Sequence, residues 1–170
     1  MINFKIFLIF LLLFPWIKID CASNGVAIVD LKKVALRSKA GKGVEEQIAA
    51  INNDAKKDFL DLEANIKSME SNKKSNSDAR TIEDAQLMLY DAVRHKKNQI
   101  ADAYRIAIST LDGEIKKVIA KICQKKGIEL VIANDAAVYV GKKFPDITSE
   151  VVAGVDLSCP AIKVELKEQK

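Results

Sequence analysis

The central part of the chain shows a helical spacing of apolar residues on both sides of a short polar segment. From Val44 to Met69 apolar side chains recur every three or four positions, which predicts one long amphipathic helix. Residues 70–80 are rich in Ser, Asn, Asp and Lys, a composition typical of a loop. A second helical spacing begins at Ile82 and continues to Ala107. The pattern therefore predicts two long helices joined by a short connection.

The two predicted helices can pack against each other as one antiparallel hairpin. With a single register, the residue numbers of two facing positions have the same sum in every layer. Apolar residues satisfy this rule in the pairs Val44 with Ala107, Ile48 with Ala103, Ile51 with Ile100, Phe59 with Ala92, Leu62 with Leu89, Ile66 with Ala85, and Met69 with Ile82. The layer of Ala55 and Lys96 has the same sum but places a charge on the seam, the row of facing residues. We therefore predict a coiled-coil hairpin arm over residues 44–107.

Charge and side-chain size refine the prediction of the arm. The first helix is acidic and the facing stretch of the second is basic, so we expect ion pairs between them. The expected pairs are Asp54 with Lys97, Asp58 with Arg94, and Glu46 with Arg105. Exposed pairs contribute only ~0–1 kcal/mol each, so they select the register more than they stabilise it. Large residues mostly face alanines, so the seam buries little apolar area and the arm should bend easily.

The segments on both sides of the arm have the composition of short strands. Residues 26–29 (VAIV) and 128–132 (IELVI) read as buried strands, and residues 137–140 (AVYV) as a third. Ile147 and Thr148 are compatible with a short fourth strand. A sheet this small has unpaired edges and little core of its own, so we expect it to be completed by oligomerisation.

The remaining helical signals complete the predicted architecture. A short helix is expected at residues 31–38, ended by Gly41 and Gly43, and the second helix of the arm continues past Ala107 to cover the sheet. The predicted fold class is α+β: a small β-barrel-like body, shared in an oligomer, from which the long antiparallel helical hairpin projects. The predicted division of the chain is 24–43 and 108–155 for the oligomerisation body, 44–107 for the arm and 156–170 for a C-terminal tail.

The first residues have the pattern of an export signal. A charged start is followed by an apolar run at residues 6–14 (IFLIFLLLF) and by small residues at Cys21 and Ser23. The run is short for a membrane span, which needs ~20 apolar residues, and suits the core of a secretory signal peptide. We predict that residues 1–23 are a signal peptide cleaved after Ser23. Cleavage after Gly25 and an uncleaved membrane anchor are the alternatives.

Export determines how the cysteines and the charge are interpreted. Cys123 and Cys159 would lie in an oxidising compartment, where they either form a disulfide that ties the tail to the long helix or stay free. The formal net charge of +4 is only mildly basic and does not by itself indicate nucleic acid. Export also argues against a nucleic-acid partner.

The sequence shows no set of residues with catalytic or metal-binding spacing. His95 is the single histidine and lies in a charged helical stretch. The segment 41–43 (GKG) is too short to indicate a phosphate-binding loop. We therefore predict that the protein is not an enzyme and has no cofactor or metal site.

Several segments occur in a recognisable order along the chain. These are the N-terminal signal, V-A-I-V-D at 26–30, a hairpin tip running from 66–69 to 77–80, G-I-E-L-V at 127–131, A-V-Y at 137–139 and D-I-T at 146–148. In this order and spacing the chain resembles the Skp/OmpH family of periplasmic outer-membrane-protein chaperones. The resemblance covers roughly residues 26–152, and the tail lies beyond the family pattern.

The resemblance implies a function and an assembly. It implies a periplasmic homotrimer whose strands join in one central barrel, with three hairpins enclosing a cavity. In that cavity the protein would hold unfolded outer-membrane proteins without ATP and prevent their aggregation. The residues expected at the client-facing seam are Ile48, Ile51, Phe59, Leu62, Ile66, Met69, Leu89 and Ile100. The alternative is a structural or adaptor coiled coil of the envelope that binds a folded partner or lipopolysaccharide.

Basic residues near the tip and on the second helix give a second candidate site. The resemblance raises contact with lipopolysaccharide phosphates or an anionic membrane surface. The candidate residues are Lys73, Lys74, Arg80, Arg94, Lys96 and Lys97. The alternative is that Arg94 and Lys97 are paired with the opposite helix and that the others form a solvated face.

Overall fold

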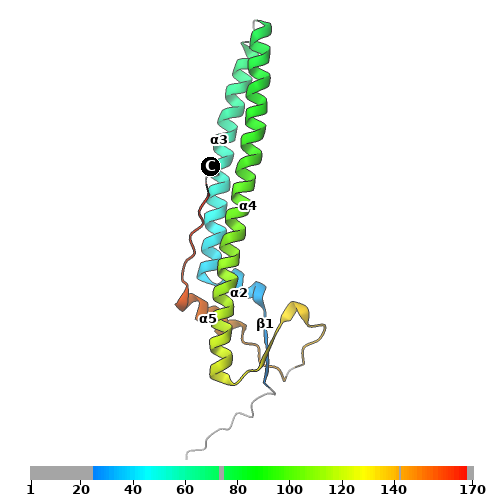
Figure 1. The fold of residues 1–170 in the computed structure, drawn as a ribbon, viewed down its shortest axis with the longest axis vertical. Helices are drawn as coiled ribbons and strands as arrows, with labels where there is room; N and C mark the ends of the chain where they lie inside the picture. The colour runs from blue at the N-terminus through cyan, green and yellow to red at the C-terminus, as the bar shows by residue number, and fades with distance from the viewer. Residues whose placement is uncertain (1–24, 73–74, 142, 168–170) are drawn as a thin grey trace, which may run out of the picture.

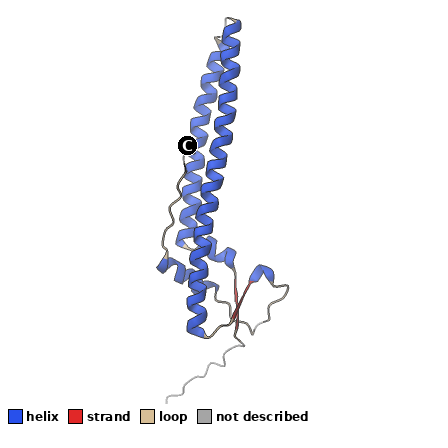
Figure 2. Cartoon of the chain, viewed as in Figure 1, coloured by secondary structure: helices blue, strands red, loops and turns tan. Residues whose placement is uncertain are grey.

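The computed structural model describes residues 25–72, 75–141 and 143–167. The predicted signal peptide at residues 1–23 lies outside the described residues. The elements are β1 (Val26–Val29), α2 (Leu31–Arg37), α3 (Lys39–Ser71), α4 (Asn76–Lys126), β2 (Leu130–Ala133), the 3-10 turn η1 (Asn134–Ala136) and α5 (Thr148–Ser158). Helices α3 and α4 form a long projecting hairpin, and the other elements gather around its base (Figures 1 and 2).

Both long helices begin at capping residues, and α4 also ends at a residue suited to that position. At the start of α3 the Ser38 hydroxyl accepts the backbone N–H of Gly41 at 3.2 Å. At the start of α4, Ser75 and Asp78 form a reciprocal capping box. Gly127 ends α4 in the left-handed conformation (φ 66°), which glycine adopts without steric cost. These caps fix where the hairpin turns and where the chain leaves α4.

Gly41 and Gly43 do not end the first short helix, so that part of the sequence prediction is wrong. Helix α2 ends at Arg37, and Gly41 and Gly43 both lie inside α3. Gly41 is needed for another reason, because a Cβ atom there would lie 1.7 Å from the carbonyl oxygen of Ala35. The absence of a side chain therefore lets the first turn of α3 approach the backbone of α2.

The sheet consists of two parallel strands, β1 and β2. Their register pairs Val26 with Leu130 and Val29 with Ala133, and an isolated parallel bridge joins Ile28 to Asp146. The connection between the strands is the whole hairpin, so the fold joins segments about a hundred residues apart. These two strands confirm two of the four predicted strands, with β2 beginning at Leu130 rather than at residue 128.

Neither of the other two predicted strands is a full strand in the described chain, although the Ile147 N–H donates to the Ile28 carbonyl of β1 at 2.9 Å. At residues 137–140 the side chains of Val138 and Tyr139 are fully or almost fully exposed, and no other described segment pairs with them. Ile147 is buried just before α5, and Thr148 opens that helix while its hydroxyl accepts the Asp30 N–H at 2.9 Å. The predicted barrel-like body is therefore not formed within one chain, and a barrel shared between chains stays a prediction.

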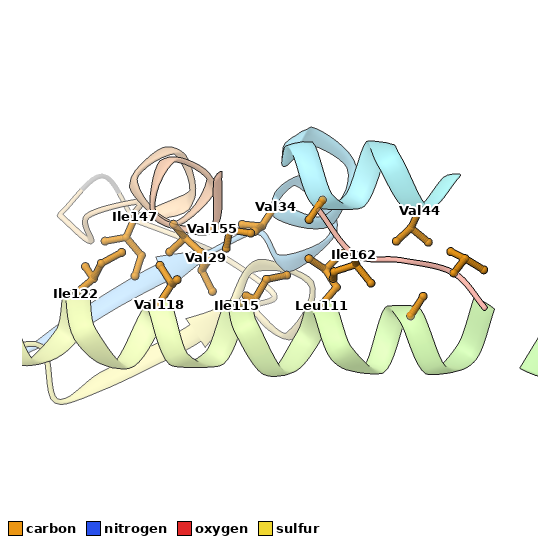
Figure 3. Close-up of a cluster of buried hydrophobic side chains, with 14 of the residues drawn as sticks. Val29, Val34, Val44, Leu111, Ile115, Val118, Ile122, Ile147, Val155 and Ile162 are labelled. Carbon is orange, nitrogen blue, oxygen red and sulfur yellow. The ribbon is translucent and has the colours of Figure 1, made fainter. Parts of the chain in front are cut away.

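The hydrophobic core lies at the base of the hairpin, where α4 meets the rest of the fold. Leu111, Ile115 and Val118 point from α4 toward β1, α2 and α5 (Figure 3). Helix α5, which the sequence did not indicate, packs closely on α4. A Cβ atom at Gly154 would lie 2.5 Å from Val118 Cγ1. This packing positions the arm, because the same helix that forms the core continues into the hairpin.

After α5 the chain turns back toward the arm. Residues 159–167 are extended and rise beside α3 (Figure 1). In this segment Ile162 and Val164 are buried and belong to the core cluster. None of the helices in the described part of the chain is both long enough and apolar enough to cross a membrane.

Candidate functional site: the hairpin arm

The seam of the arm is well covered near the base and poorly covered toward the tip. Near the base, Val44, Ala103 and Ala107 are each at most 4% exposed. Toward the tip, Leu62 is 44% exposed and Met69 is 38% exposed. The sequence-predicted seam residues divide accordingly: Ile66 and Ile100 are buried, Ile48, Ile51, Phe59 and Leu89 are half-buried, and Leu62 and Met69 are exposed. The prediction that the seam buries little area agrees with this gradient.

In the middle of the arm the seam takes a different course along α4 from the predicted one. Ala92, which was expected to face Phe59, is exposed, and Val93 is half-buried in its place. Val93 and Lys96 line one cavity of about 330 Å³ together with Phe59 of the opposite helix. Spacings of four and three residues, as from Leu89 to Val93 and then to Lys96, keep a helix face on its partner. At this layer it is Val93, rather than the expected Ala92, that shares a cavity with Phe59.

The layer of Ala55 and Lys96 remains on the seam despite its charge. Ala55 is 5% exposed, and Lys96 is half-buried beside it in the same cavity. A lysine can cover apolar neighbours with its aliphatic stem while its ammonium group reaches water. This layer is accordingly bordered by a flexible side chain and an open cavity rather than by a packed apolar pair.

Near the tip, shallow cavities open on both sides of the hairpin. One of about 370 Å³ is lined by Glu63, Ile66, Lys67, Glu70, Gln86, Leu89, Tyr90 and Val93. The other, of about 340 Å³, is lined by Leu62, Asn65, Ile66, Met69, Ala85, Met88, Leu89 and Ala92. Ile66 and Leu89 line both, so they separate two open apolar depressions. A two-helix arm has no third element to cover these depressions.

The distal arm also exposes apolar side chains that the seam cannot use. We call this set the distal apolar residues: Leu60, Leu62, Met69, Leu87, Met88 and Tyr90. Met88 is 74% exposed and Tyr90 is 66% exposed. The sequence carried a signal for them, because residues 87–90 (LMLY) are four consecutive apolar residues and one helix face cannot bury all four.

The predicted ion pairs between the two helices of the arm are not formed. Asp54 pairs with Lys57 of its own helix at 3.7 Å, and Arg105 pairs with Asp102 at 3.1 Å. Hydrogen bonds of 2.8 Å join the helices instead, one from the Tyr104 hydroxyl to Glu45 and one from Gln86 Nε2 to Glu70. The bond from its hydroxyl to the Glu45 carboxylate raises the pKa of Tyr104. Exposed charged side chains thus prefer partners one turn away, where little entropy is lost.

The candidate basic residues of the arm differ in exposure, and those that the structure describes are not paired with the opposite helix. Arg80, Arg94 and Lys97 are exposed, Lys96 is half-buried, and none of the four takes part in an ion pair within the described residues. Lys73 and Lys74 lie outside the described residues. The alternative in which the opposite helix neutralises Arg94 and Lys97 is therefore not what the structure shows.

The two cysteines are both free thiols and half-buried. Cys123 lies in the last turns of α4, and the Cys159 thiol donates a hydrogen bond to the Ala161 carbonyl at 3.6 Å. The disulfide that the sequence left open is thus not formed. The described residues also contain no group of three His, Cys, Asp or Glu side chains able to hold a metal ion.

A comparison with protein-family models identifies one family, and a comparison with solved structures identifies a similar fold. The sequence model of the family described as "Outer membrane protein (OmpH-like)" matches residues 25–155. A solved structure of an OmpH-like protein from Caulobacter crescentus CB15, described as a candidate outer membrane chaperone, superimposes with a TM-score of 0.76. It is 15% identical, and the match covers 85% of this chain and 91% of that one, so it supports the fold alone. Among curated proteins no sequence matches this chain.

Proposed function

Because the chain belongs to the OmpH-like family of outer membrane proteins, we propose that it is an ATP-independent holdase chaperone of the periplasm. In this proposal it binds unfolded outer-membrane proteins between helical arms and prevents their aggregation. The family match confirms the resemblance seen in the sequence and supports a chaperone role in general terms. Holding of unfolded clients is the step that we add.

The observation that carries this proposal is the exposure of the distal apolar residues on an arm two helices thick. An unfolded outer-membrane protein presents many short segments in which apolar and polar residues alternate. Side chains such as Met88 and Tyr90 offer flexible or amphipathic contacts that suit many such segments. Many weak contacts in one cavity give useful avidity while each contact exchanges quickly, so release does not require ATP.

The exposed apolar surface at the base supports an assembly. Leu130 on β2 is 53% exposed, and Val138 and Tyr139 beyond it are 106% and 87% exposed. Apolar side chains beside an open sheet edge favour pairing with another chain. We therefore propose a homotrimer in which residues 137–140 pair as strands between chains and complete a shared barrel. A molar mass of a single chain at micromolar concentration would contradict this assembly.

The alternative function, contact with an anionic envelope surface, has one supporting observation. Arg80, Arg94 and Lys97 have exposed side chains without ion-pair partners among the described residues. Such cations attract phosphate groups of lipopolysaccharide at low ionic strength. An Arg80→Ala/Arg94→Ala/Lys97→Ala variant that binds lipopolysaccharide as strongly as the parent would remove this candidate.

A dilution experiment tests the holdase proposal. An outer-membrane β-barrel protein unfolded in urea is diluted into buffer containing a threefold excess of residues 24–170, and light scattering and complex mass are followed. We expect scattering to be suppressed and a soluble complex to form without ATP. Unchanged aggregation, with no complex, means that the protein is not a holdase.

A further inference from the structure

The C-terminal segment that lies outside the family match is docked on the arm in an extended conformation. The family model ends at residue 155, whereas residues 159–167 are extended along the lower part of the hairpin (Figure 1). Exposure alternates along this segment. Ile162 and Val164 are each 9% exposed and Leu166 is half-buried, whereas Lys163, Glu165 and Lys167 are exposed. The Lys163 ammonium and the Glu165 carboxylate pair at 2.9 Å on the outer face, as expected for side chains two apart in a strand.

Two glutamines of the arm hold this segment by its backbone. Gln47 of α3 donates from Nε2 to the Ile162 carbonyl at 2.8 Å and accepts the Val164 N–H at 3.0 Å through Oε1. Gln99 of α4 donates to the Lys167 carbonyl at 3.3 Å. The paired contacts of Gln47 resemble the exchange of hydrogen bonds between neighbouring strands. Because these three hydrogen bonds are made to backbone atoms, they do not depend on which side chains the bound segment carries.

The side chains of the segment fill space that the arm itself leaves open. Ile162 and Val164 join the cluster formed by Val44, Ala103 and Ala107 at the base of the seam. Figure 3 shows Ile162 between α3, which carries Val44, and α4, which carries Leu111. The small side chains of Ala103 and Ala107 leave room on the seam for the alternate apolar residues of the extended tail, and we call the surface that the tail covers the groove. The groove thus selects an alternating apolar pattern and an extended backbone.

We propose that this groove is a binding site for extended, alternating segments of an unfolded client and that the protein's own tail occupies it until a client displaces it. The proposal rests on the holdase function proposed above and names one subsite for it. The alternation of the tail, apolar at 162, 164 and 166 and charged between, is the pattern of an outer-membrane β-strand. A tethered occupant competes at an effective concentration in the millimolar range, so it covers apolar surface when no client is present.

The competing explanation is that the tail is a permanent brace between α3 and α4. A brace and a displaceable occupant predict opposite effects on client binding. Removal of a brace lets the arm splay and weakens client holding, whereas removal of an occupant opens the groove and strengthens it. The test therefore depends on the sign of the change.

The test uses residues 24–170, the same chain ended after Ser158, and the full chain with Ile162→Asp/Val164→Asp, which detaches the tail without shortening the protein. The matched control is Lys163→Ser/Glu165→Ser, which alters only the outer face. The probe is a fluorescein-labelled peptide with the sequence of residues 159–167 and serine in place of Cys159, followed by anisotropy. A second peptide has the same composition but groups its apolar residues together.

We expect the truncated and detached chains to bind the alternating peptide on the order of tenfold or more tightly than the full chain and the control. The regrouped peptide should bind weakly to all four. Gln47→Ala in the truncated chain should reduce peptide binding severalfold. The truncated chain should also suppress aggregation of the diluted β-barrel protein at a lower concentration than the full chain.

Other results overturn the inference in distinguishable ways. If the full chain holds the barrel protein and truncation leaves or weakens that holding, the groove is not a client subsite, and the proposed function survives. If neither chain holds it, the proposed function fails and the client role of the groove fails with it. If the truncated and detached chains both lose their helical circular dichroism, the tail is a brace.

Discussion

The base and the tip of the hairpin are formed by the same two helices but differ in what surrounds them. At the base, Leu111 and Ile115 of α4 are 1% and 3% exposed because α2, α5 and β1 cover them. Near the tip, Leu87 and Met88 of the same helix are 59% and 74% exposed, since only α3 lies beside them. Apolar content is similar at both ends, so the number of covering elements decides whether it stabilises the fold or stays available to bind.

The largest expected difference is between the same leucine-to-alanine substitution made at the base and at the tip. Leu111→Ala should lower the free energy of unfolding by ~2–5 kcal/mol, because it leaves a cavity in a closed core. Leu87→Ala should change it by no more than ~0.5 kcal/mol, because that side chain already contacts water. Urea unfolding followed by circular dichroism measures both. Equal losses in the two variants would mean that the tip is packed in solution.

Glycine positions in α3 test how closely the base is packed. Gly41→Ala should destabilise by ~1–3 kcal/mol, because the new methyl group would meet the Ala35 carbonyl oxygen at 1.7 Å. Gly43→Ala, two residues further, meets nothing within 4 Å and should stabilise by ~0.5–1 kcal/mol through helix propensity. The opposite signs are read from urea midpoints. A stabilising Gly41→Ala would show that α2 and α3 do not approach as described.

Sequence reasoning found the hairpin because its signal is local and repeated over many turns. It missed α5, whose Val151, Val152 and Val155 are weak helix formers, so packing on α4 decides their conformation. It also missed the docking of the tail, although the alternation at 162–166 was visible. That alternation says which side chains share a face but not which surface far away in the sequence receives them.

The predicted ion pairs between the two helices of the arm failed for a related reason. Opposite charges on facing helices favour one register. A charged side chain can also pair with a partner one turn away on its own helix, as Asp54 does with Lys57, and that pair does not depend on the position of the other helix. Near the tip, the four consecutive apolar residues 87–90 were the one sequence signal that apolar side chains would be exposed. The sequence pattern therefore predicted the position of the arm along the chain well, but predicted the side-chain contacts within it poorly.

Filling the weak layer in the middle of the arm should make the distal part behave more like the base. Lys96→Leu places an apolar side chain beside Ala55 and Phe59 and should raise the free energy of unfolding by about 1 kcal/mol. The stiffer arm should then hold unfolded clients less well. His95→Leu, at an exposed neighbouring position that does not line this cavity, is the control and should leave stability unchanged. Improved client holding by Lys96→Leu would argue that flexibility of the arm is not used.

Polar substitution of exposed apolar residues should separate binding from stability. Leu87→Ser/Met88→Ser/Tyr90→Ser should weaken client holding severalfold, a change of roughly 1 kcal/mol in binding. The urea midpoint should barely move. The control is Leu157→Ser, at a leucine of α5 at the base that is 87% exposed, more than any of these three residues. Suppression of light scattering is titrated for both, and an equal loss in the control would place the client contacts outside the tip.

The smallest effect concerns acid sensitivity at the base, where Asp30 caps α2. Its carboxylate accepts the Lys33 backbone N–H at 2.8 Å and pairs with the Lys33 ammonium at 2.9 Å. These contacts, the backbone hydrogen bond foremost, lower the pKa of Asp30 below its ordinary value of 3.8. A pKa lowered in the folded state gives stability that is complete above the pKa of the unfolded state and is lost as pH falls through the pKa of the folded state.

Asp30→Ser keeps a capping oxygen without the charge, so the amount by which the variant is less stable than the parent should shrink between about pH 5 and pH 2. Urea midpoints across this range measure the difference, and a disadvantage that stays constant would mean that the charge of Asp30 does not contribute.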